Sequence, residues 1–314
     1  MRELVKTIDP DIVFTSGWVD KGYLRCCRVI RAKDKPVVMC SDTAWRDDFR
    51  QNLAVFLARF WLKRTFSHAW VTGGSQLMYA RKLGFRKSRV LKGFYSADVD
   101  RFAPLYDRFR PVKTARFPHR FLCVARYIPT KGVQDLCDAF HELRNEGRAG
   151  DWGLWIAGTG ELHDQVMHSA SGVDPHTKHL GFVQPADMPA VLEQCGVFVL
   201  PSLYEPWGVV VHEHACAGFP MLLSHRVGAA DMFLVEGENG QRFMAGDIDS
   251  MKDALRWIIA KHDEDLLRMS ERSAFVGRQW DTARWAQVAM GFLERRKCTR
   301  AIGHGAAPVI IAPR

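Results

Sequence analysis

Short apolar runs, separated by longer amphipathic stretches, are the feature of this sequence that most limits its fold. Seven runs rich in Val, Ile, Leu and Phe occur: DIVFTS (11–16), PVVMCS (36–41), AWVTG (69–73), RFLCVAR (120–126), GLWIAG (153–158), VFVLPS (197–202) and PMLLSH (220–225). A short run that is apolar throughout indicates a strand buried on both faces, and alternation with helices is typical of a parallel sheet covered by helices. The sequence therefore predicts an α/β fold.

The chain is long enough for two domains of average size, with 314 residues of which 47% are hydrophobic. Residues 103–120 are polar and basic and contain Pro104, Pro111 and Pro118, a composition typical of an interdomain linker. We place the boundary near residue 112. The expected parts are an N-terminal domain (1–111), a second domain (112–281), and a C-terminal helix that packs back toward the N-terminal domain, followed by a loosely held tail (282–314).

The eight cysteines indicate neither a zinc site nor a disulfide framework. No C-x-x-C pair occurs, and Cys26 and Cys27 are adjacent, so we expect reduced, mostly buried thiols. The N-terminus lacks the layout of a signal peptide, and no uncharged apolar run reaches the length of about 18 residues that a membrane span needs. We therefore expect a cytoplasmic protein.

The net charge of +9 and the pI of about 9.2 suit a polyanionic partner, such as nucleic acid, anionic lipid or a phosphorylated substrate. The basic residues are scattered, and no helix-turn-helix, zinc-finger or RNA-binding signature occurs, which argues against nucleic acid. Two basic stretches, 108–120 and 294–300, are interpreted as a solvated linker and tail. Peripheral contact with anionic lipid headgroups is the alternative for both.

The second domain alternates regularly between strand and helix patterns. The expected strands are 121–126, 153–158, 179–183, 197–202 and 221–225, and the expected helices are 133–145, 161–171, 187–195, 208–218, 250–261, 265–277 and 282–296. This winding is Rossmann-like, and ligands of such folds bind at the carboxyl ends of the strands. Three loops follow strands there and are expected to meet in one crevice: ARYIPTKG (125–132), AGTGEL (157–162) and PSLYEPWG (201–208).

Arg126 and Lys131 lie in the turn that begins the expected helix 133–145. Two cations beside a helix N-terminus oppose the preference of the helix dipole for negative charge. An anion bound between them would relieve the conflict, and a diphosphate is the natural candidate. The alternative is a pair of ordinary solvated surface charges.

The glycines of the second loop, Gly158 and Gly160, resemble the start of a dinucleotide-binding motif, but the third glycine position is His163, so the motif fails. Glycine still allows a phosphate to approach the backbone closely at a helix N-terminus. A simple tight turn is an equally open interpretation.

Two glutamates, Glu205 and Glu213, flank the start of the expected helix 208–218. If the helix starts after Gly208, Glu213 lies roughly 7 Å along its axis. One carboxylate can then contact each end of a bound ligand. Because carboxylates accept hydrogen bonds from paired hydroxyls, a sugar joined through diphosphate to a ribose fits the spacing.

At this point the sequence resembles the GT-B-fold retaining glycosyltransferases with an E-x7-E motif, commonly classed as family 4. The resemblance covers most of residues 121–296 and is carried by ARYIPTKG, WIAGTGEL, HLGFVQPADMPAVLEQCGVFVLPSLYEPWGVVVHEHACAGFP, HRVGAADMFLVEGENGQRF and QWD. It is thinner in the first domain, where KTIDPDIVFTSGW, DKPVVMCSD and VLKGFYSADVDRF match. The implied fold is GT-B, with two Rossmann-like domains.

The resemblance assigns roles to individual positions. It implies that Arg126 and Lys131 hold the donor diphosphate, that Glu213 binds the ribose hydroxyls and that Glu205 contacts the transferred sugar. The remaining implied contacts are the backbone of Gly208 and Val209 with sugar and phosphate, and the backbone near Phe182 and Val183 with the base. No cofactor and no divalent metal are implied.

The first domain departs from the family pattern. The strand and Gly-Gly loop that usually open this domain are not recognised, and the Gly-Gly pair at 73 and 74 comes too late. We therefore expect an incomplete N-terminal domain whose open sheet edge is covered by another copy or another polypeptide. Asp42, in SDTAW (41–45), stands at or near the position where many relatives carry a His. It is expected to orient the acceptor or donor sugar, or else to cap a helix.

The implied activity is sugar transfer from a nucleotide diphosphate sugar to the hydroxyl of a saccharide or lipid-linked acceptor, with retention at the anomeric carbon. We expect a role in cell-surface polysaccharide or glycolipid synthesis, with peripheral contact at the inner face of the membrane. Two alternatives remain: a GT-B sugar-nucleotide epimerase, and a non-catalytic protein that binds the donor or a partner.

Overall fold

The structure is a computed structural model that describes the backbone of residues 2–58 and 61–301, and the side chains of these ranges up to residue 294. It divides into two compact units. Unit 1 comprises residues 1–71, 75–94 and 283–314, and unit 2 comprises residues 72–74 and 95–282. The expected loose tail at 302–314 and the side chains of the basic stretch after residue 294 lie outside the described residues.

The segment that we expected to be a linker is a helix of unit 2. Helix α6 (Val99–Ala115) continues through Pro104 and Pro111 and belongs to the same compact unit as the residues that follow it, so the chain does not divide near residue 112. Its buried side chains Leu105, Phe109 and Lys113 are spaced four residues apart. This buried stripe stabilises the helix although each proline removes a main-chain hydrogen bond.

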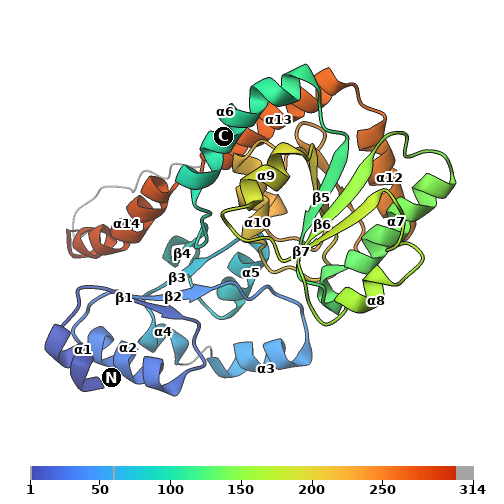
Figure 1. The fold of residues 1–314 in the computed structure, drawn as a ribbon. Coiled ribbons are helices and arrows are strands. Elements are labelled where there is room, and N and C mark those ends of the chain that lie inside the picture. The colour runs from blue at the N-terminus through green and yellow to red at the C-terminus, as the bar shows by residue number, and fades with distance from the viewer. Residues whose placement is uncertain (1, 59–60, 302–314) are drawn as a thin grey trace. The chain divides into compact units, whose positions relative to one another are not determined.

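Unit 1 contains a parallel sheet with the strand order β1-β2-β3-β4 (Figure 1). The strands are β1 (Val13–Ser16), β2 (Val37–Ser41), β3 (His68–Val71) and β4 (Val90–Leu91), and the helices are α1 (Arg2–Ile8), α2 (Lys21–Ala32), α3 (Phe49–Ala58), α4 (Leu62–Thr65), α5 (Gly74–Lys82) and the short 3₁₀ turn η1 (Lys87–Arg89). In the described part of the chain, β1 is hydrogen-bonded to β2 alone and forms the edge of the sheet. Strand β4 has only two residues, too few for an apolar run to predict it.

Helix α14 (Thr282–Ala301) contributes to the core of unit 1. Phe292 and Trp285 pack against the fully buried Trp70 of β3, with ring centroids 5.6 and 4.8 Å away. Trp285 also donates a hydrogen bond from Nε1 to the carbonyl of Phe94 at 2.7 Å. The chain thus returns to unit 1 after completing unit 2.

Unit 2 contains a parallel sheet with the order β10-β9-β8-β5-β6-β7. The strands are β5 (Arg120–Val124), β6 (Gly153–Ala157), β7 (Thr177–Gly181), β8 (Val197–Leu200), β9 (Met221–Ser224) and β10 (Gly240–Phe243). The expected strands of this unit are confirmed to within two residues at each end. Strand β10 was not predicted, because its sequence GQRF is half polar and contains no apolar run.

Helices cover both faces of this sheet (Figure 1). The helices after α6 are α7 (Val133–Asn145), α8 (His163–Met167), α9 (Met188–Glu193), α10 (Val209–Cys216), α11 (Ala230–Phe233), α12 (Ile248–Ile259) and α13 (Asp263–Arg278), with the 3₁₀ turn η2 (Pro129–Lys131). Helices α7 and α12 share one hydrophobic cluster with β5. On the other face, α10 stacks His214 on Phe198 of β8 and packs against α6 and α13.

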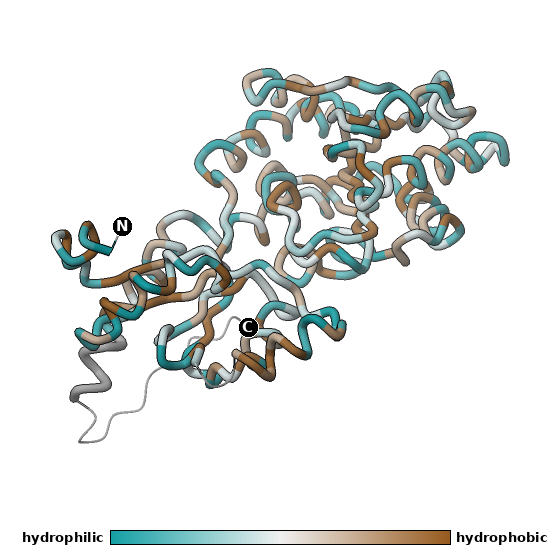
Figure 2. Tube along the Cα trace, turned by 90° about the horizontal axis from the view of Figure 1, so that it is seen from below, coloured by the Kyte–Doolittle hydropathy of each residue, from teal (hydrophilic) through white to brown (hydrophobic). Residues whose placement is uncertain are grey.

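The distribution of apolar residues agrees with this layered arrangement. In Figure 2 the helices alternate between hydrophilic and hydrophobic residues along the chain. All four residues of β8 and all four of β9 are buried, as expected for central strands of a parallel sheet. No described helix combines the length and the apolar character that crossing a membrane requires.

The seven cysteines with described side chains are free and buried, which confirms the prediction for them; Cys298 lies outside the described side chains. Burial raises the pKa of the Cys123 and Cys195 thiols to about 12. Such thiols stay protonated and unreactive at neutral pH.

Candidate functional site

The strand order of unit 2 reverses between β5 and β8, which are hydrogen-bonded neighbours although two strands, β6 and β7, lie between them in sequence order. In open α/β sheets, ligands bind outside the carboxyl ends of the strands at such a reversal. The loops that follow β5 and β8 are residues 125–132 and 201–208, two of the three loops singled out in the sequence.

These two loops are tied together by an ion pair and by main-chain hydrogen bonds. The Lys131 ammonium contacts the Glu205 carboxylate, and the two side chains are only 17% and 13% exposed. The carbonyl of Thr130 accepts hydrogen bonds from the backbone N–H groups of Leu203 at 2.9 Å and Tyr204 at 3.2 Å. The structure therefore brings Lys131 and Glu205 together at the strand reversal.

Glycine is required where the first of these loops passes the second. Gly132 has a φ of +62°, and a Cβ atom added there would overlap the carbonyl oxygen of Pro201. A larger residue would therefore be strained in its backbone and would also push the two loops apart. The Lys-Gly pair at 131 and 132 thus serves both the ion pair and the close passage.

Arg126 lies in the same loop as Lys131 but is exposed. Its guanidinium makes no ion pair with a residue that the structure describes, unlike the ammonium of Lys131. A guanidinium in a fixed loop with its donors free can bind the planar oxygens of a phosphate or carboxylate in a bidentate manner.

Gly158 and Gly160 have a packing role that the sequence did not predict. The loop after β6 lies against the loop after β5, with hydrogen bonds from Ala125 N to Ala157 O and from Tyr127 N to Thr159 O, at 3.1 and 3.0 Å. A Cβ on Gly158 would overlap the Ala125 carbonyl, and one on Gly160 would lie 2.5 Å from the Tyr127 carbonyl. Both glycines are therefore needed to seat one loop on the other.

Helix α10 begins at Val209, and Gly208 precedes it in a left-handed conformation with a φ of +91°. A Cβ on Gly208 would lie 3.1 Å from Cγ of Glu205, so the glycine lies directly beside that side chain. The expected start of the helix after Gly208 is confirmed. The backbone N–H groups at the start of α10 therefore lie next to Glu205.

Glu213 lies in the middle of α10 and is partly buried. Burial raises the pKa of its carboxyl above the usual value of 4.5, while the nearby Arg101 guanidinium lowers it and the Asp98 carboxylate raises it further. Both neighbours belong to the beginning of α6. Arg101 also donates a hydrogen bond to the carbonyl of Pro185, in the loop after β7.

Phe182 and Val183 open this loop after β7, and Phe182 is 66% exposed. Because β7 is parallel to β5 and β8, its loop lies at the same edge of the sheet. The Arg101 hydrogen bond to Pro185 and the electrostatic effect of Arg101 on Glu213 connect this loop with the middle of α10. Phe182 and Val183 thus lie at the same edge of the sheet as the other candidate residues of unit 2.

His212 is a positioning residue that the sequence analysis missed. Its Nδ1 accepts a hydrogen bond from Ala97 N at 2.9 Å, and its Nε2 therefore carries the proton and donates to Gly277 O at 2.9 Å. Burial lowers the pKa of His212 to about 4, so the ring is neutral at pH 7. It fixes the segment before α6 against α10, next to Glu213. The only sequence signal was a histidine within the apolar stretch VVVHEHA.

Asp42 belongs to unit 1, whereas the other candidate residues belong to unit 2. It directly follows β2, and its carbonyl accepts a hydrogen bond from Gln76 Nε2 at 3.2 Å. The interpretation as a helix N-cap is wrong, because α3 begins only at Phe49 and Asp48 Oδ1 accepts the hydrogen bond from Gln51 N at 2.8 Å.

Comparison with known families gives a match to the model described as "Glycosyl transferases group 1" over residues 118–261. Residues 118–261 therefore resemble a group 1 glycosyltransferase domain. This domain runs from β5 through α12, and it contains the ion pair of Lys131 and Glu205 as well as Arg126 and Glu213.

Curated relatives of the domain include a GDP-mannose-dependent alpha-(1-6)-phosphatidylinositol monomannoside mannosyltransferase of Mycolicibacterium smegmatis, 27% identical over 205 residues. A phosphatidyl-myo-inositol mannosyltransferase of Mycobacterium leprae is 32% identical over 174 residues. These alignments cover 60% and 54% of this chain but 50% and 43% of the relatives. The chain thus spans about half the length of these two relatives.

Solved structures resemble the chain over nearly its whole length. HepE from Anabaena, solved in complex with UDP, aligns with a TM-score of 0.72 and 19% identity over 93% of this chain and 81% of its own. The lipopolysaccharide outer core galactosyltransferase WaaB aligns with a TM-score of 0.67 and 16% identity over 95% and 78%. The predicted fold class, GT-B with two Rossmann-like domains, is confirmed.

Proposed function

We propose that the chain is a retaining glycosyltransferase of the family 4 type, which transfers a sugar from a nucleotide diphosphate sugar to an acceptor hydroxyl. The observation that carries the proposal is the pairing of Lys131 with Glu205 at the strand reversal of unit 2. Lys131 can bind a diphosphate and Glu205 can accept a hydrogen bond from a sugar hydroxyl, so a donor can contact both side chains at once. The group 1 glycosyltransferase domain around them supports the assignment.

In this proposal Arg126 and Lys131 bind the diphosphate. Arg126 is exposed and available, and Lys131 exchanges its contact with Glu205 for a phosphate oxygen when the donor binds. Glu205 is then released to accept hydrogen bonds from the transferred sugar, while the backbone at Gly208 and Val209 approaches sugar and phosphate. Exchanging one charged contact for another avoids leaving a mostly buried ion unpaired.

At the other end of the donor, Glu213 accepts hydrogen bonds from the ribose hydroxyls. The backbone near Phe182 and Val183 lines the pocket for the base. Gly158 and Gly160 act indirectly, because they seat the loop of residues 157–162 on the loop that carries Arg126.

The chemistry that follows is departure of the diphosphate through an oxocarbenium-like transition state. The bond between the anomeric carbon and the diphosphate oxygen breaks, and negative charge grows on the leaving group. Arg126, Lys131 and the N–H groups at the start of α10 stabilise that charge because they are already oriented. The acceptor oxygen attacks from the same face, and its proton passes to the departing diphosphate. Asp42 orients the acceptor.

We further propose that no divalent metal is needed, because the two cations supply the charge that a metal would supply. Asp-x-Asp triplets do occur, at 98–100 and 247–249 among others. Asp98 and Asp247 accept hydrogen bonds from the backbone N–H groups of Arg101 at 3.2 Å and Ser250 at 2.9 Å and so cap α6 and α12. Full turnover in excess chelator is expected, and loss of turnover that Mg²⁺ restores would contradict this part of the proposal.

The names of the relatives support a choice of acceptor class. They include mannosyltransferases acting on phosphatidylinositol compounds and a putative colanic acid biosynthesis glycosyltransferase of Escherichia coli. We therefore propose a saccharide or lipid-linked acceptor in cell-surface polysaccharide or glycolipid synthesis, reached in the cytoplasm at the membrane surface. A partner chain that pairs with β1 is part of the same proposal.

The test begins with a screen of UDP-, GDP- and ADP-sugars for thermal stabilisation of the full chain, because a ligand that binds only the folded state raises the Tm. The stabilising donor is then incubated with and without saccharide and glycolipid acceptors. Acceptor-dependent release of nucleoside diphosphate with retained anomeric configuration supports transfer. Conversion of the donor without acceptor identifies an epimerase, and stabilisation without any turnover identifies a binding protein.

A further inference from the structure

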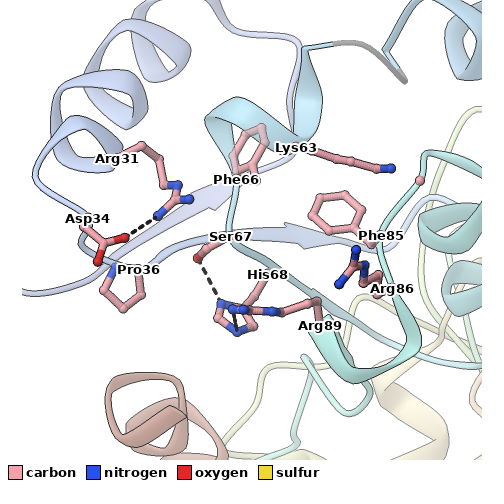
Figure 3. Close-up of a pocket in the computed structure, with 11 residues that line it drawn as sticks. Arg31, Asp34, Pro36, Lys63, Phe66, Ser67, His68, Phe85, Arg86 and Arg89 are labelled. Carbon is pink, nitrogen blue, oxygen red and sulfur yellow. Dashed lines mark hydrogen bonds and ion pairs between the residues drawn. The ribbon is translucent and has the colours of Figure 1, made fainter. Parts of the chain in front are cut away.

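A second candidate site lies in unit 1, at the opposite end of its sheet from Asp42. A cavity of about 480 Å³ opens where β2, β3 and β4 begin, lined by Pro36, Ser67 and Arg89, the residues that precede these strands (Figure 3). The roles proposed above use loops at carboxyl ends of strands, whereas this cavity lies at amino ends. None of the proposed donor or acceptor residues lines it.

The cavity is strongly basic. Four cations line it, Arg31, Lys63, Arg86 and Arg89, against the single carboxylate of Asp34. Figure 3 shows Arg31 on one side, from α2, and Arg86 and Arg89 on the other. An excess of positive charge around one concave surface raises the local potential and attracts anions.

Most of this charge is not neutralised within the described part of the chain. The nearest Arg31 nitrogen lies 3.8 Å from the Asp34 carboxylate, a long ion pair, and Arg31 Nε is buried without a hydrogen-bond partner among the described residues. Lys63 and Arg86 are exposed and make no ion pair with a described residue. Scattered surface cations are usually solvated, but here they share one cavity with a buried, unsatisfied donor.

Arg89 is held in place by a buried relay. Ser67 Oγ donates to the carbonyl of Val37 at 2.9 Å, so His68 Nδ1, at 2.9 Å, must donate its proton to Ser67 Oγ. His68 Nε2 is then an acceptor and takes a hydrogen bond from Arg89 Nη1 at 3.1 Å. His68 is 3% exposed and neutral in this arrangement. It fixes the Arg89 guanidinium without neutralising its charge.

We propose that this cavity binds a phosphate group. Guanidinium groups present paired donors that match phosphate oxygens, and a preoriented group loses little conformational entropy on binding. Arg31 and Arg89 provide such groups from two sides, while Lys63 and Arg86 add charge at the rim. Phe66 and Phe85, which are 2% and 5% exposed, line the cavity with apolar surface beside the cations. The phosphate is carried either by a soluble molecule or by an anionic phospholipid headgroup.

The experiment compares three full-length proteins: wild type, Lys63→Gln/Arg86→Gln, and the control Lys21→Gln/Arg25→Gln. Both variants remove one exposed lysine and one exposed arginine from unit 1, but Lys21 and Arg25 lie on α2 outside the cavity. None of the four side chains makes an ion pair with a described residue, so both variants should fold, which circular-dichroism melting checks.

Titration calorimetry with inorganic phosphate gives the first readout. Losing two charged contacts is expected to weaken phosphate binding at least about tenfold in the cavity variant, whereas the control stays within about twofold of wild type. The proposal is overturned if phosphate binding weakens equally in both variants. It is also overturned if the cavity variant binds phosphate as well as the wild type, or if the wild type binds no phosphate. Since Arg126 and Lys131 are intact in all three proteins, phosphate bound at the proposed donor site does not contribute to the difference.

Vesicle sedimentation separates the two sources of the phosphate. Wild type is mixed with phosphatidylcholine vesicles with and without phosphatidylglycerol. Binding that needs phosphatidylglycerol and is lost in the cavity variant alone identifies a lipid headgroup. Calorimetric phosphate binding without vesicle binding identifies a soluble phosphorylated ligand. Vesicle binding that both variants lose equally reflects net charge and counts against the cavity.

Discussion

Lys131 and Glu205 form an ion pair that joins the loops after β5 and β8, the two strands between which the strand order of unit 2 reverses. Their side chains come from segments 74 residues apart in the sequence and are mostly buried. A pair in this position keeps each charge compensated before a ligand arrives. It also places one cationic group, Lys131, and one acidic group, Glu205, of the proposed donor site in direct contact.

The strength of this pair can be measured with a double-mutant cycle. Lys131→Met leaves a mostly buried Glu205 carboxylate without its partner, and we expect a loss of about 1–3 kcal/mol in the free energy of unfolding. Adding Glu205→Gln removes the orphaned charge, so the double variant should recover much of that loss. Urea denaturation gives the four free energies. Strictly additive single effects would show that the two side chains do not interact in solution.

Arg126→Ala should weaken binding of the nucleoside diphosphate without weakening the fold. The guanidinium is exposed and makes no ion pair with a described residue, so the Tm of the unliganded protein should not change. One lost charge-assisted hydrogen bond corresponds to about 1.5–3 kcal/mol, or roughly tenfold to a hundredfold in Kd. Arg116→Ala, an exposed arginine at the end of α6, is the matched control. Equal losses in both variants would mean that Arg126 acts only through net charge.

Donor affinity should decrease as the pH is lowered, because of Glu213. Burial raises the pKa of this carboxyl above 4.5, so the ionised form that accepts two ribose hydrogen bonds is lost at a higher pH than for an ordinary glutamate. The Kd for nucleoside diphosphate should therefore rise as the pH is lowered toward the raised pKa of Glu213. Glu213→Gln should bind more weakly at pH 7 and should lose this pH dependence.

The stability of the unliganded protein gives an independent check on Glu213, because it should rise as the pH is lowered whereas donor affinity should fall. The folded state binds the Glu213 proton more tightly than the unfolded state does, so this group adds stability as the pH falls through its raised pKa. The exposed Glu264 of α13 serves as the control position. A Glu264→Gln variant with the same altered pH profile would assign the effect to general electrostatics.

The sequence predicted unit 2 well because central parallel strands are apolar on both faces. Strands such as β8 and β9 are buried along their whole length, and a continuous apolar run is enough to find them. The chemistry-bearing loops could then be located, since they follow directly from strand ends. Lys131, Glu205 and Gly208 were identified in this way.

Features that depend on tertiary packing could not be predicted. Prolines in α6 suggested a linker, but a buried stripe that includes Leu105 and Phe109 stabilises the helix. For the GTG loop, the sequence left a phosphate-binding turn and a simple tight turn equally open. Only the Ala125 and Tyr127 carbonyls reveal the close packing of the two loops. The basic cavity of unit 1 combines residues scattered between Arg31 and Arg89, with no local motif.

Lys113 was likewise counted as part of a basic surface stretch, yet it is only 4% exposed. Its Nζ lacks a hydrogen-bond partner among the described residues and lies 3.8 Å from the centroid of the Phe219 ring. Burial lowers the pKa of this ammonium to about 7. At and below neutral pH the folded protein therefore bears the cost of a buried charge.

Lys113→Met should consequently stabilise the protein. Between pH of about 7 and 10.5 the unfolded state carries a proton on Lys113 that the folded state lacks, so wild-type stability should rise with pH across this window. The methionine variant should lose that rise and should gain roughly 1–3 kcal/mol at pH 6. Thermal melts at several pH values test both points. A lower Tm for the variant at pH 6 would show that the cation contact with Phe219 outweighs desolvation.

Gly158→Ala should disturb the site through packing. An added Cβ would overlap the carbonyl oxygen of Ala125, so the loop after β6 must move away from the loop that carries Arg126. We expect a loss of stability of more than about 2 kcal/mol and weaker binding of nucleoside diphosphate. Gly237→Ala is the control, because Gly237 has a φ of +79° but nothing within 4 Å of a Cβ. It should cost only the strain of the left-handed backbone, about 1 kcal/mol, and leave binding intact. Equal losses of stability in the two variants would show that backbone strain alone, and not the Ala125 carbonyl, requires glycine at position 158.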